Sequence, residues 1–138
     1  MVEKRSIEDA QRVLNSQPFS AMLGTIISQY DESGVTLELP LKPEYLQQHG
    51  YVHGGVQCYL ADNALTFAGG QALGPAVLTA AVNLTYLRPA QGEKLIARAS
   101  TQGRTSRTAA TQVEIYVQNG NDEYLCAVGH GTISAVKK

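Results

Sequence analysis

The stretch His53-Gly54-Gly55-Val56-Gln57-Cys58-Tyr59-Leu60-Ala61-Asp62-Asn63-Ala64-Leu65-Thr66-Phe67-Ala68 decides the fold of this 138-residue chain. It opens on two glycines and continues at helical spacing with almost no polar face. A helix that lies on a surface needs such a face, so this helix is expected to be buried on most sides. We expect Gly69-Gly70 and then Gly74-Pro75 to end it.

Segments rich in β-favouring residues follow this helix. Turn-forming residues separate them, beginning with Pro89-Ala90-Gln91-Gly92, and each loop has the composition of a hairpin connection. The pattern predicts an antiparallel meander of four strands, at residues 77–87, 94–101, 108–118 and 124–134.

The part of the chain before the helix has two further patterns. Ser6 and Asp9 resemble a capping box with Asp in place of Glu, which predicts a short helix that Pro18 stops. Residues 25–30 then favour β structure, residues 31–34 have the composition of a turn, and apolar and polar side chains alternate over 35–41. This pattern is typical of a hairpin with one buried face. A polar loop at 42–52 leads to His53.

A single buried helix needs a sheet around it, and about six strands are available. The predicted fold class is therefore α+β, with one curved antiparallel sheet wrapped around a long central helix and a short helix at the N-terminus. The length suits one domain, and no linker or repeat divides it, so residues 1–138 are expected to form a single domain.

Composition narrows the classes of partner and compartment. Eleven basic residues stand against twelve acidic ones, so no broad field favours nucleic acid or anionic lipid. Cys58 and Cys126 lie in apolar stretches without metal or redox spacing, which favours reduced core thiols and a cytoplasmic location. The sequence begins without the pattern of a signal peptide, and polar residues interrupt its longest apolar stretch, so we expect a soluble protein.

Three motifs in order carry a resemblance: His53-Gly54-Gly55, then Leu60-Ala61-Asp62-Asn63-Ala64, then the stretch at 83–90, which reads Asn-Leu-Thr-Tyr-Leu-Arg-Pro-Ala. Together they resemble the phenylacetic-acid-degradation (PaaI-like) branch of hotdog-fold thioesterases. The resemblance covers nearly the whole chain and extends to Gly129-His130-Gly131-Thr132. It implies an acyl-CoA thioesterase that works as a homodimer, often as a homotetramer, with sites between subunits.

Thioester hydrolysis needs a carboxylate that activates water or attacks directly, and donors aimed at the carbonyl oxygen. Asp62 is the candidate carboxylate. If the glycines open the helix, its first N–H groups lack partners, and that of Gly54, alone or with Gly55, is the candidate oxyanion hole. Without the motif, the simpler interpretation is that the two glycines only allow the chain to turn tightly into a packed helix.

Asp62 lies eight residues beyond Gly54, which corresponds to about 12 Å along a helix axis. That is too far for both to serve one carbonyl. Either Asp62 is unrelated to the oxyanion hole, or the two meet across an interface where helices of two subunits run antiparallel. The resemblance implies the second arrangement.

The resemblance assigns further roles residue by residue. Gln47 falls where the family carries Asn or sometimes Gln, a side chain that orients the carbonyl or the water; the alternative is an ordinary loop residue. His53 either donates to the carbonyl or braces the loop. Thr79 matches a Ser or Thr that holds water near the carboxylate, although threonine is common in strands.

Coenzyme A carries phosphates that require local positive charge. Arg88, Arg104 and Arg107 flank predicted hairpins and are candidate contacts for it, together with the backbone of Gly55. No cofactor is expected, since the CoA thioester is the substrate, and His49 and His53 lack the third ligand of a metal site. The alternatives are a hotdog dehydratase or hydratase, which would depend on His53, and a non-catalytic acyl-CoA-binding protein.

Overall fold

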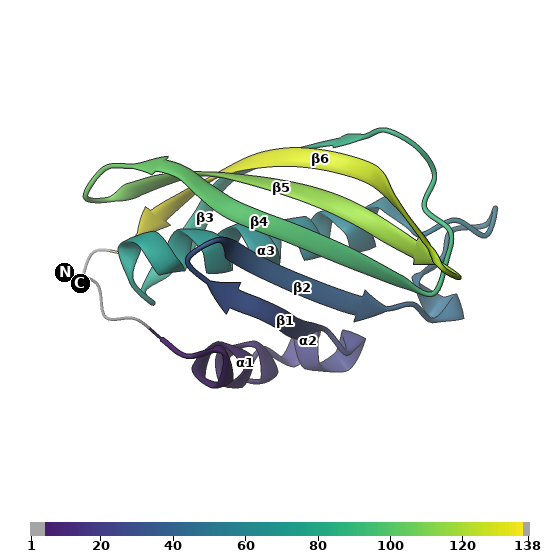
Figure 1. Ribbon diagram of the computed structural model, residues 1–138, viewed down its shortest axis with the longest axis horizontal. Helices are drawn as coiled ribbons and strands as arrows, with labels where there is room; N and C mark the ends of the chain where they lie inside the picture. Colours follow the sequence, from purple (N-terminus) through teal and green to yellow (C-terminus); the bar gives the residue numbers. More distant parts are fainter. Residues whose placement is uncertain (1–4, 137–138) are drawn as a thin grey trace.

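The computed structural model describes residues 5–136. Two short helices precede a hairpin, a long helix follows, and four strands complete the chain (Figure 1). The elements are α1 (Ile7–Asn15), α2 (Pro18–Leu23), β1 (Ile26–Asp31), β2 (Gly34–Pro40), the single-turn helix η1 (Pro43–Tyr45), α3 (Gly54–Leu73), β3 (Val77–Tyr86), β4 (Lys94–Arg104), β5 (Thr108–Asn119) and β6 (Asp122–Ala135).

The six strands form one antiparallel sheet in the order β1-β2-β4-β5-β6-β3, and the sheet curves around α3 (Figure 1). α3 contacts every strand from β2 to β6. Its buried leucines Leu60 and Leu65 pack in one core with side chains such as Val113 and Ile115 of β5. Burial of each such side chain stabilises the fold by roughly 1.5–3 kcal/mol. The predicted α+β architecture with one central helix is confirmed.

β3 does not take the position expected of it. A simple meander would place β3 beside β4, but β3 pairs with β6 and forms one edge of the sheet. The 87–93 connection is therefore a crossover and not a hairpin loop. Its backbone is bonded to other elements, since the Leu87 N–H donates to Cys126 O at 2.8 Å and Ala90 O accepts from the Val52 N–H at 2.9 Å.

The N-terminal region contains two short helices where the sequence predicts one. The predicted capping box of Ser6 and Asp9 begins α1, and both of its hydrogen bonds are present. Pro18 does end that pattern, but it also occupies the first turn of α2. Proline is favoured there because the N–H it lacks has no partner in a first helical turn. α1 and α2 lie along β1 (Figure 1).

α3 continues past the two glycines expected to end it. Gly69 and Gly70 are buried inside the helix, which ends at Leu73 with Gly74 as its C-cap. Gly69 is required by packing, because a Cβ added there would lie 2.5 Å from the Cβ of Ile133 on β6. The glycine allows helix and strand to approach closely.

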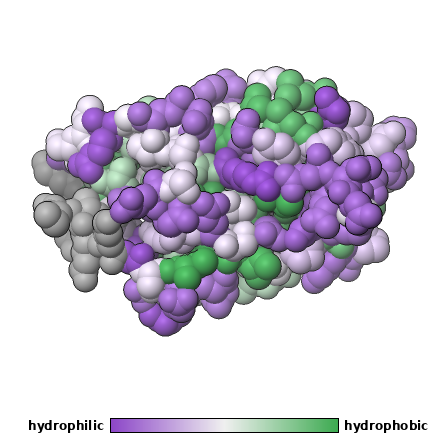
Figure 2. Space-filling view, in the orientation of Figure 1, coloured by the Kyte–Doolittle hydropathy of each residue, from purple (hydrophilic) through white to green (hydrophobic). Residues whose placement is uncertain are grey.

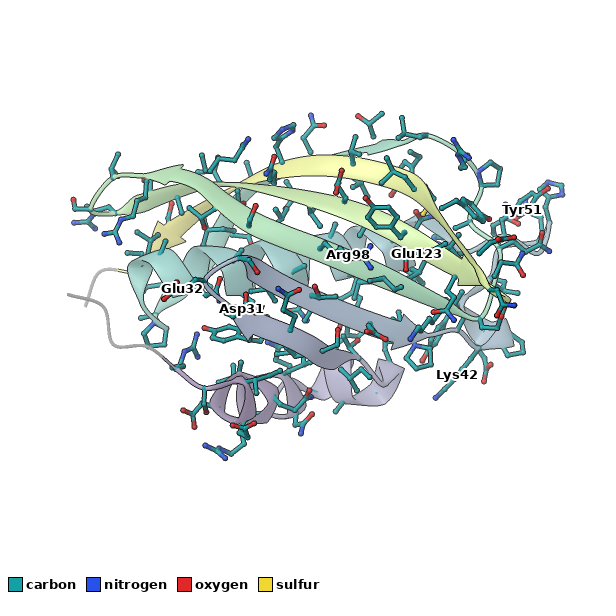
Figure 3. The ribbon with its side chains drawn as sticks, in the orientation of Figure 1. Asp31, Glu32, Lys42, Tyr51, Arg98 and Glu123 are labelled. Atoms are coloured by element: carbon teal, nitrogen blue, oxygen red, sulfur yellow. The ribbon has the colours of Figure 1, made fainter. Side chains whose placement is uncertain are left out.

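The outer face of the sheet is largely hydrophilic (Figure 2). Hydrophobic residues gather in two separate patches in this view, one near β6 and one along β1 and the N-terminal helices. Across the sheet, Arg98 of β4 and Glu123 of β6 form an ion pair at 2.6 Å (Figure 3). The sheet therefore places its apolar side toward α3.

Candidate active site

One face of α3 is directed toward the edge strand β3. Gly54, Asp62 and Thr66 lie on this face, because residues four apart along a helix stack above one another. Contacts confirm the placement: Asp62 and Thr66 bond to Thr79 of β3, and Gly54 bonds to Tyr86 of the same strand. The chemistry-bearing residues of the helix therefore meet β3.

The Asp62 carboxylate is half-buried, and one of its two oxygens is hydrogen-bonded. Its Oδ1 accepts a hydrogen bond of 2.6 Å from Thr79 Oγ1. Thr66 Oγ1 lies 2.8 Å from Thr79 Oγ1 and 3.4 Å from the same Oδ1. Among residues 5–136 no side chain bonds to Oδ2, so one carboxylate oxygen is left for water or a substrate. Thr79, the candidate for holding water near the carboxylate, is thus itself bonded to Asp62.

A β-bulge brings Thr79 and Tyr86 to the same side of β3. They are seven residues apart, and an odd separation in a regular strand directs two side chains to opposite faces. The register between β3 and β6 shifts between Thr79 and Ala81. Since a bulge adds one residue to one strand, the alternation is reversed beyond it, and both side chains reach α3.

His53 and the two glycines form the N-terminus of α3. His53 is the N-cap, and its Nδ1 accepts a hydrogen bond of 2.8 Å from the Gly55 N–H. The Gly54 N–H has no acceptor within the described part of the chain. Of the two amides suggested as an oxyanion hole, that of Gly55 is already bonded and that of Gly54 is available.

Gln47 lies in the loop before α3, where its backbone bonds to that of Tyr51, a residue at one end of the molecule (Figure 3). Its Oε1 accepts from the backbone N–H of His49, and its own N–H donates to Tyr51 O at 2.8 Å. These bonds brace the loop. The side-chain amide nitrogen has no acceptor among residues 5–136, so it remains able to donate.

The three candidate arginines, Arg88, Arg104 and Arg107, lie near opposite ends of α3. Arg88 stands 5.7 Å from the ring centre of Tyr124, near the N-terminal end of α3. Arg104, the last residue of β4, donates to the carbonyl of Ala72 at the opposite end of that helix, and Arg107 belongs to the exposed loop that follows β4. Within one chain they do not surround a single site.

The cysteines differ in environment. Cys126 is fully buried, and burial raises the pKa of its thiol to about 11, so this side chain remains a neutral thiol at physiological pH. Cys58 is partly buried on α3, between Gly54 and Asp62. Both thiols are free.

One cavity lies away from these residues. It has a volume of about 850 Å³ and is lined by the β1–β2 turn, by β4 and by the C-terminal half of α3. Asp31 and Glu32 of that turn stand at the opposite end of the molecule from Tyr51 (Figure 3). Neither Asp62 nor Gly54 borders this cavity, so the cavity does not mark the predicted site.

Within residues 5–136, no helix is long and apolar enough to cross a membrane. No group of three or more His, Cys, Asp or Glu residues in this range is arranged to hold a metal ion.

Comparison with known proteins decides the family. The family model described as "Thioesterase superfamily" matches residues 49–124, which include α3, β3 and the loop between β3 and β4. The chain belongs to the thioesterase superfamily. The Archaeoglobus fulgidus protein named "Putative esterase" is 31% identical over 118 residues, which are 85% of this chain and 74% of that protein.

Solved structures of other thioesterases share the fold of this superfamily member. A thioesterase from Haemophilus influenzae superposes with a TM-score of 0.85 at 26% identity, over 98% of this chain and 93% of that one. The PaaI protein of Escherichia coli superposes with a TM-score of 0.84 at 23% identity, over 94% and 92% of the two chains, which shows a shared fold. The predictions of a hotdog fold and of a thioester hydrolase are confirmed.

Thr66 and Tyr86 bond to the candidate site residues Asp62 and Gly54, and neither is among the residues predicted from the sequence. Thr66 could have been found from its spacing, since it lies one helical turn beyond Asp62. Tyr86 stands inside one of the quoted motifs, but only the bulge in β3 directs it toward Gly54. No pattern in the sequence announces that bulge.

Proposed function

We propose that this thioesterase hydrolyses acyl-CoA thioesters, with Asp62 as the catalytic carboxylate and the Gly54 N–H as the donor to the carbonyl oxygen. The observation that carries the proposal is the pairing of a half-buried carboxylate, held at Oδ1 by Thr79, with an unbonded N–H at a helix N-terminus. Asp62 either activates water or attacks the carbonyl through its free oxygen.

The leaving group explains why one carboxylate is sufficient. A thiol has a pKa near 8.5, so a thiolate departs without a dedicated general acid. His53 is not required for proton transfer, and its Nδ1 already accepts from Gly55. In a hydratase, by contrast, a histidine would move the proton, and His53 would have to do so through its other ring nitrogen, Nε2.

The edge strand β3 supports a site shared between two subunits. Its outer edge has no partner strand among residues 5–136, and its Leu78 and the following Leu87 are 65% and 52% exposed. An unpaired edge is a template for a further strand. A second copy that paired antiparallel to β3, centred on Asn83, would bring Tyr86 opposite the partner's Thr79, because the bulge adds one residue between Thr79 and Ala81.

Such a dimer would solve the distance problem within one chain. Thr79 marks the position of Asp62, and Tyr86 marks that of Gly54. The two-fold axis would therefore bring Asp62 of one subunit toward Gly54 of the other, across the roughly 12 Å that separates them along one helix. A homodimer is the smallest unit with complete sites, and a homotetramer would pair two of them.

The same dimer would gather the positive charge proposed for CoA. Arg88 lies near the N-terminal end of α3, whereas Arg104 and Arg107 lie at the other end. Because the two helices would run antiparallel, Arg104 and Arg107 of one subunit would approach Arg88 of the other. Guanidinium groups from two chains would then bind the phosphates. Gln47 would donate its amide to the carbonyl.

A panel of short, medium, long and aryl acyl-CoAs tests the proposal, with free thiol as the readout. We expect hydrolysis of at least one member, and a loss of roughly 10²- to 10⁴-fold in kcat for Asp62→Asn, since the amide is not a base. Asp122→Asn, at the exposed β5–β6 turn, is the matched control and should retain full activity.

Two results would contradict the proposal. If no acyl-CoA releases thiol, the substrate class is wrong, and binding without turnover would identify an acyl-CoA-binding protein. If Asp62→Asn is as active as the Asp122→Asn control, the carboxylate has no catalytic role.

A further inference from the structure

The peptide group between Gly54 and Gly55 is held at both of its polar ends. Its carbonyl, Gly54 O, accepts a hydrogen bond of 2.7 Å from the hydroxyl of Tyr86. Its amide, Gly55 N–H, donates to Nδ1 of His53 at 2.8 Å. One peptide plane is therefore fixed by two side chains, one from the loop before α3 and one from the edge strand.

This fixation matters because glycine has the largest conformational freedom of any residue. Without restraint, Gly54 at the first turn of a helix could rotate, and its own N–H would turn with it. The clamp formed by Tyr86 and His53 holds the following peptide, so it also limits rotation about Gly54. An oxyanion donor is effective when its direction is set before the reaction begins.

The Tyr86 ring also fits against Gly54. A Cβ added to Gly54 would meet the Tyr86 hydroxyl oxygen at 3.3 Å, which is close contact. Burial, with a smaller contribution from Cys58, raises the pKa of the Tyr86 hydroxyl above its usual range. The hydroxyl therefore remains protonated near neutral pH and able to donate to the carbonyl.

We propose that Tyr86 is a positioning residue of this thioesterase, which together with the N-cap His53 orients the Gly54 N–H toward the thioester carbonyl. Tyr86 does not touch the reacting atoms. It acts through the Gly54–Gly55 peptide, and His53 contributes as a hydrogen-bond acceptor. The inference rests on the proposed function of Gly54.

Paired variants test both sides of the clamp. Tyr86→Phe keeps the ring and removes the donor, while Tyr116→Phe removes a hydroxyl that bonds to Glu114 and serves as the control. His53→Asn keeps an N-cap acceptor for the Gly55 N–H, whereas His53→Ala removes it. Tyr86 is 49% exposed, so the loss of its hydroxyl should leave the fold intact.

We expect Tyr86→Phe to lower kcat roughly tenfold to hundredfold, because a misplaced group costs rate even when binding is kept. KM should change less than about threefold, and Tyr116→Phe should match the wild type. His53→Asn should keep most of the activity that His53→Ala loses. In protein labelled with ¹⁵N-glycine, Tyr86→Phe should speed hydrogen exchange of the Gly55 amide and leave Gly120 unchanged.

Several outcomes would overturn the inference. Wild-type kcat in Tyr86→Phe, or unchanged exchange at Gly55, would show that the hydroxyl positions nothing. His53→Asn as impaired as His53→Ala would assign His53 a chemical role instead. The failure of the proposed function would look different. A wild-type protein that hydrolysed no acyl-CoA would have no oxyanion hole, and Tyr86 would then have no donor to position.

Discussion

At the scale of single residues, the site depends on which hydrogen-bonding groups are already occupied. The Asp62 carboxylate has one oxygen bonded to Thr79 and one without a protein partner within the described range. Of the first two amides of α3, Gly55 is bonded to His53 and Gly54 has no acceptor. The sequence could suggest the residue types, but it could not decide which amide remains available.

Two substitutions of Gly54 distinguish the loss of its N–H donor from crowding by an added side chain. Gly54→Pro removes the N–H and suits both the first position of a helix and the extended conformation of His53, at φ −58° and ψ 134°. Gly54→Ala retains the N–H and adds a Cβ. Steady-state kinetics should show a loss of about 10²–10³ in kcat for the proline variant, as for other oxyanion donors, and a much smaller loss for alanine. Equal losses in the two variants would assign the effect to crowding.

At the scale of elements, α3 and the strands are fitted to each other through small residues. Gly69 allows α3 to approach Ile133 of β6, and Gly131 of β6 faces Leu65, whose Cδ1 would lie 2.8 Å from an added Cβ. In the sequence, Gly69-Gly70 predicts the end of the helix, because glycine is common where helices end. Close packing against β6 explains why Gly69 lies inside the helix.

Two neighbouring glycines give a matched test of this packing. A Cβ at Gly69 would overlap Ile133, whereas one at Gly70 would meet its nearest atom, in the Arg5 side chain, at an ordinary 3.4 Å. Gly69→Ala should therefore destabilise the fold by roughly 1–3 kcal/mol. Gly70→Ala should be neutral or stabilising by up to about 1 kcal/mol, through helix propensity. Urea unfolding measures both, and equal stability of the two variants would refute the packing argument.

At the scale of the whole molecule, the proposed catalytic unit depends on the edge of the sheet. β3 holds the partners of both Asp62 and Gly54, and it is the strand whose outer side lacks a neighbour among residues 5–136. A pair of subunits joined there would complete two sites, while a single chain would complete none. This dimer is the part of the proposal most open to a direct test.

Complementation between two inactive variants tests whether sites are shared. Asp62→Asn lacks the carboxylate and Gly54→Pro lacks the donor, so homodimers of either should be inactive. Random mixing upon co-expression would make half of the dimers mixed, each with one intact site of two, which predicts about a quarter of wild-type kcat under two-fold symmetry. Activity no higher than that of the separate variants would place each complete site within one chain.

The sequence by itself determined the fold class, the presence of one long buried helix and the motifs around Asp62 and Gly54, because these depend on local periodicity and residue type. The tertiary structure decided the rest. Pairing across the sheet moved β3 to the edge, a bulge turned Tyr86 toward α3, and hydrogen-bond competition left the Gly54 N–H unbonded. Each of these depends on residues far apart in the chain, which compete for partners only once the fold has brought them together.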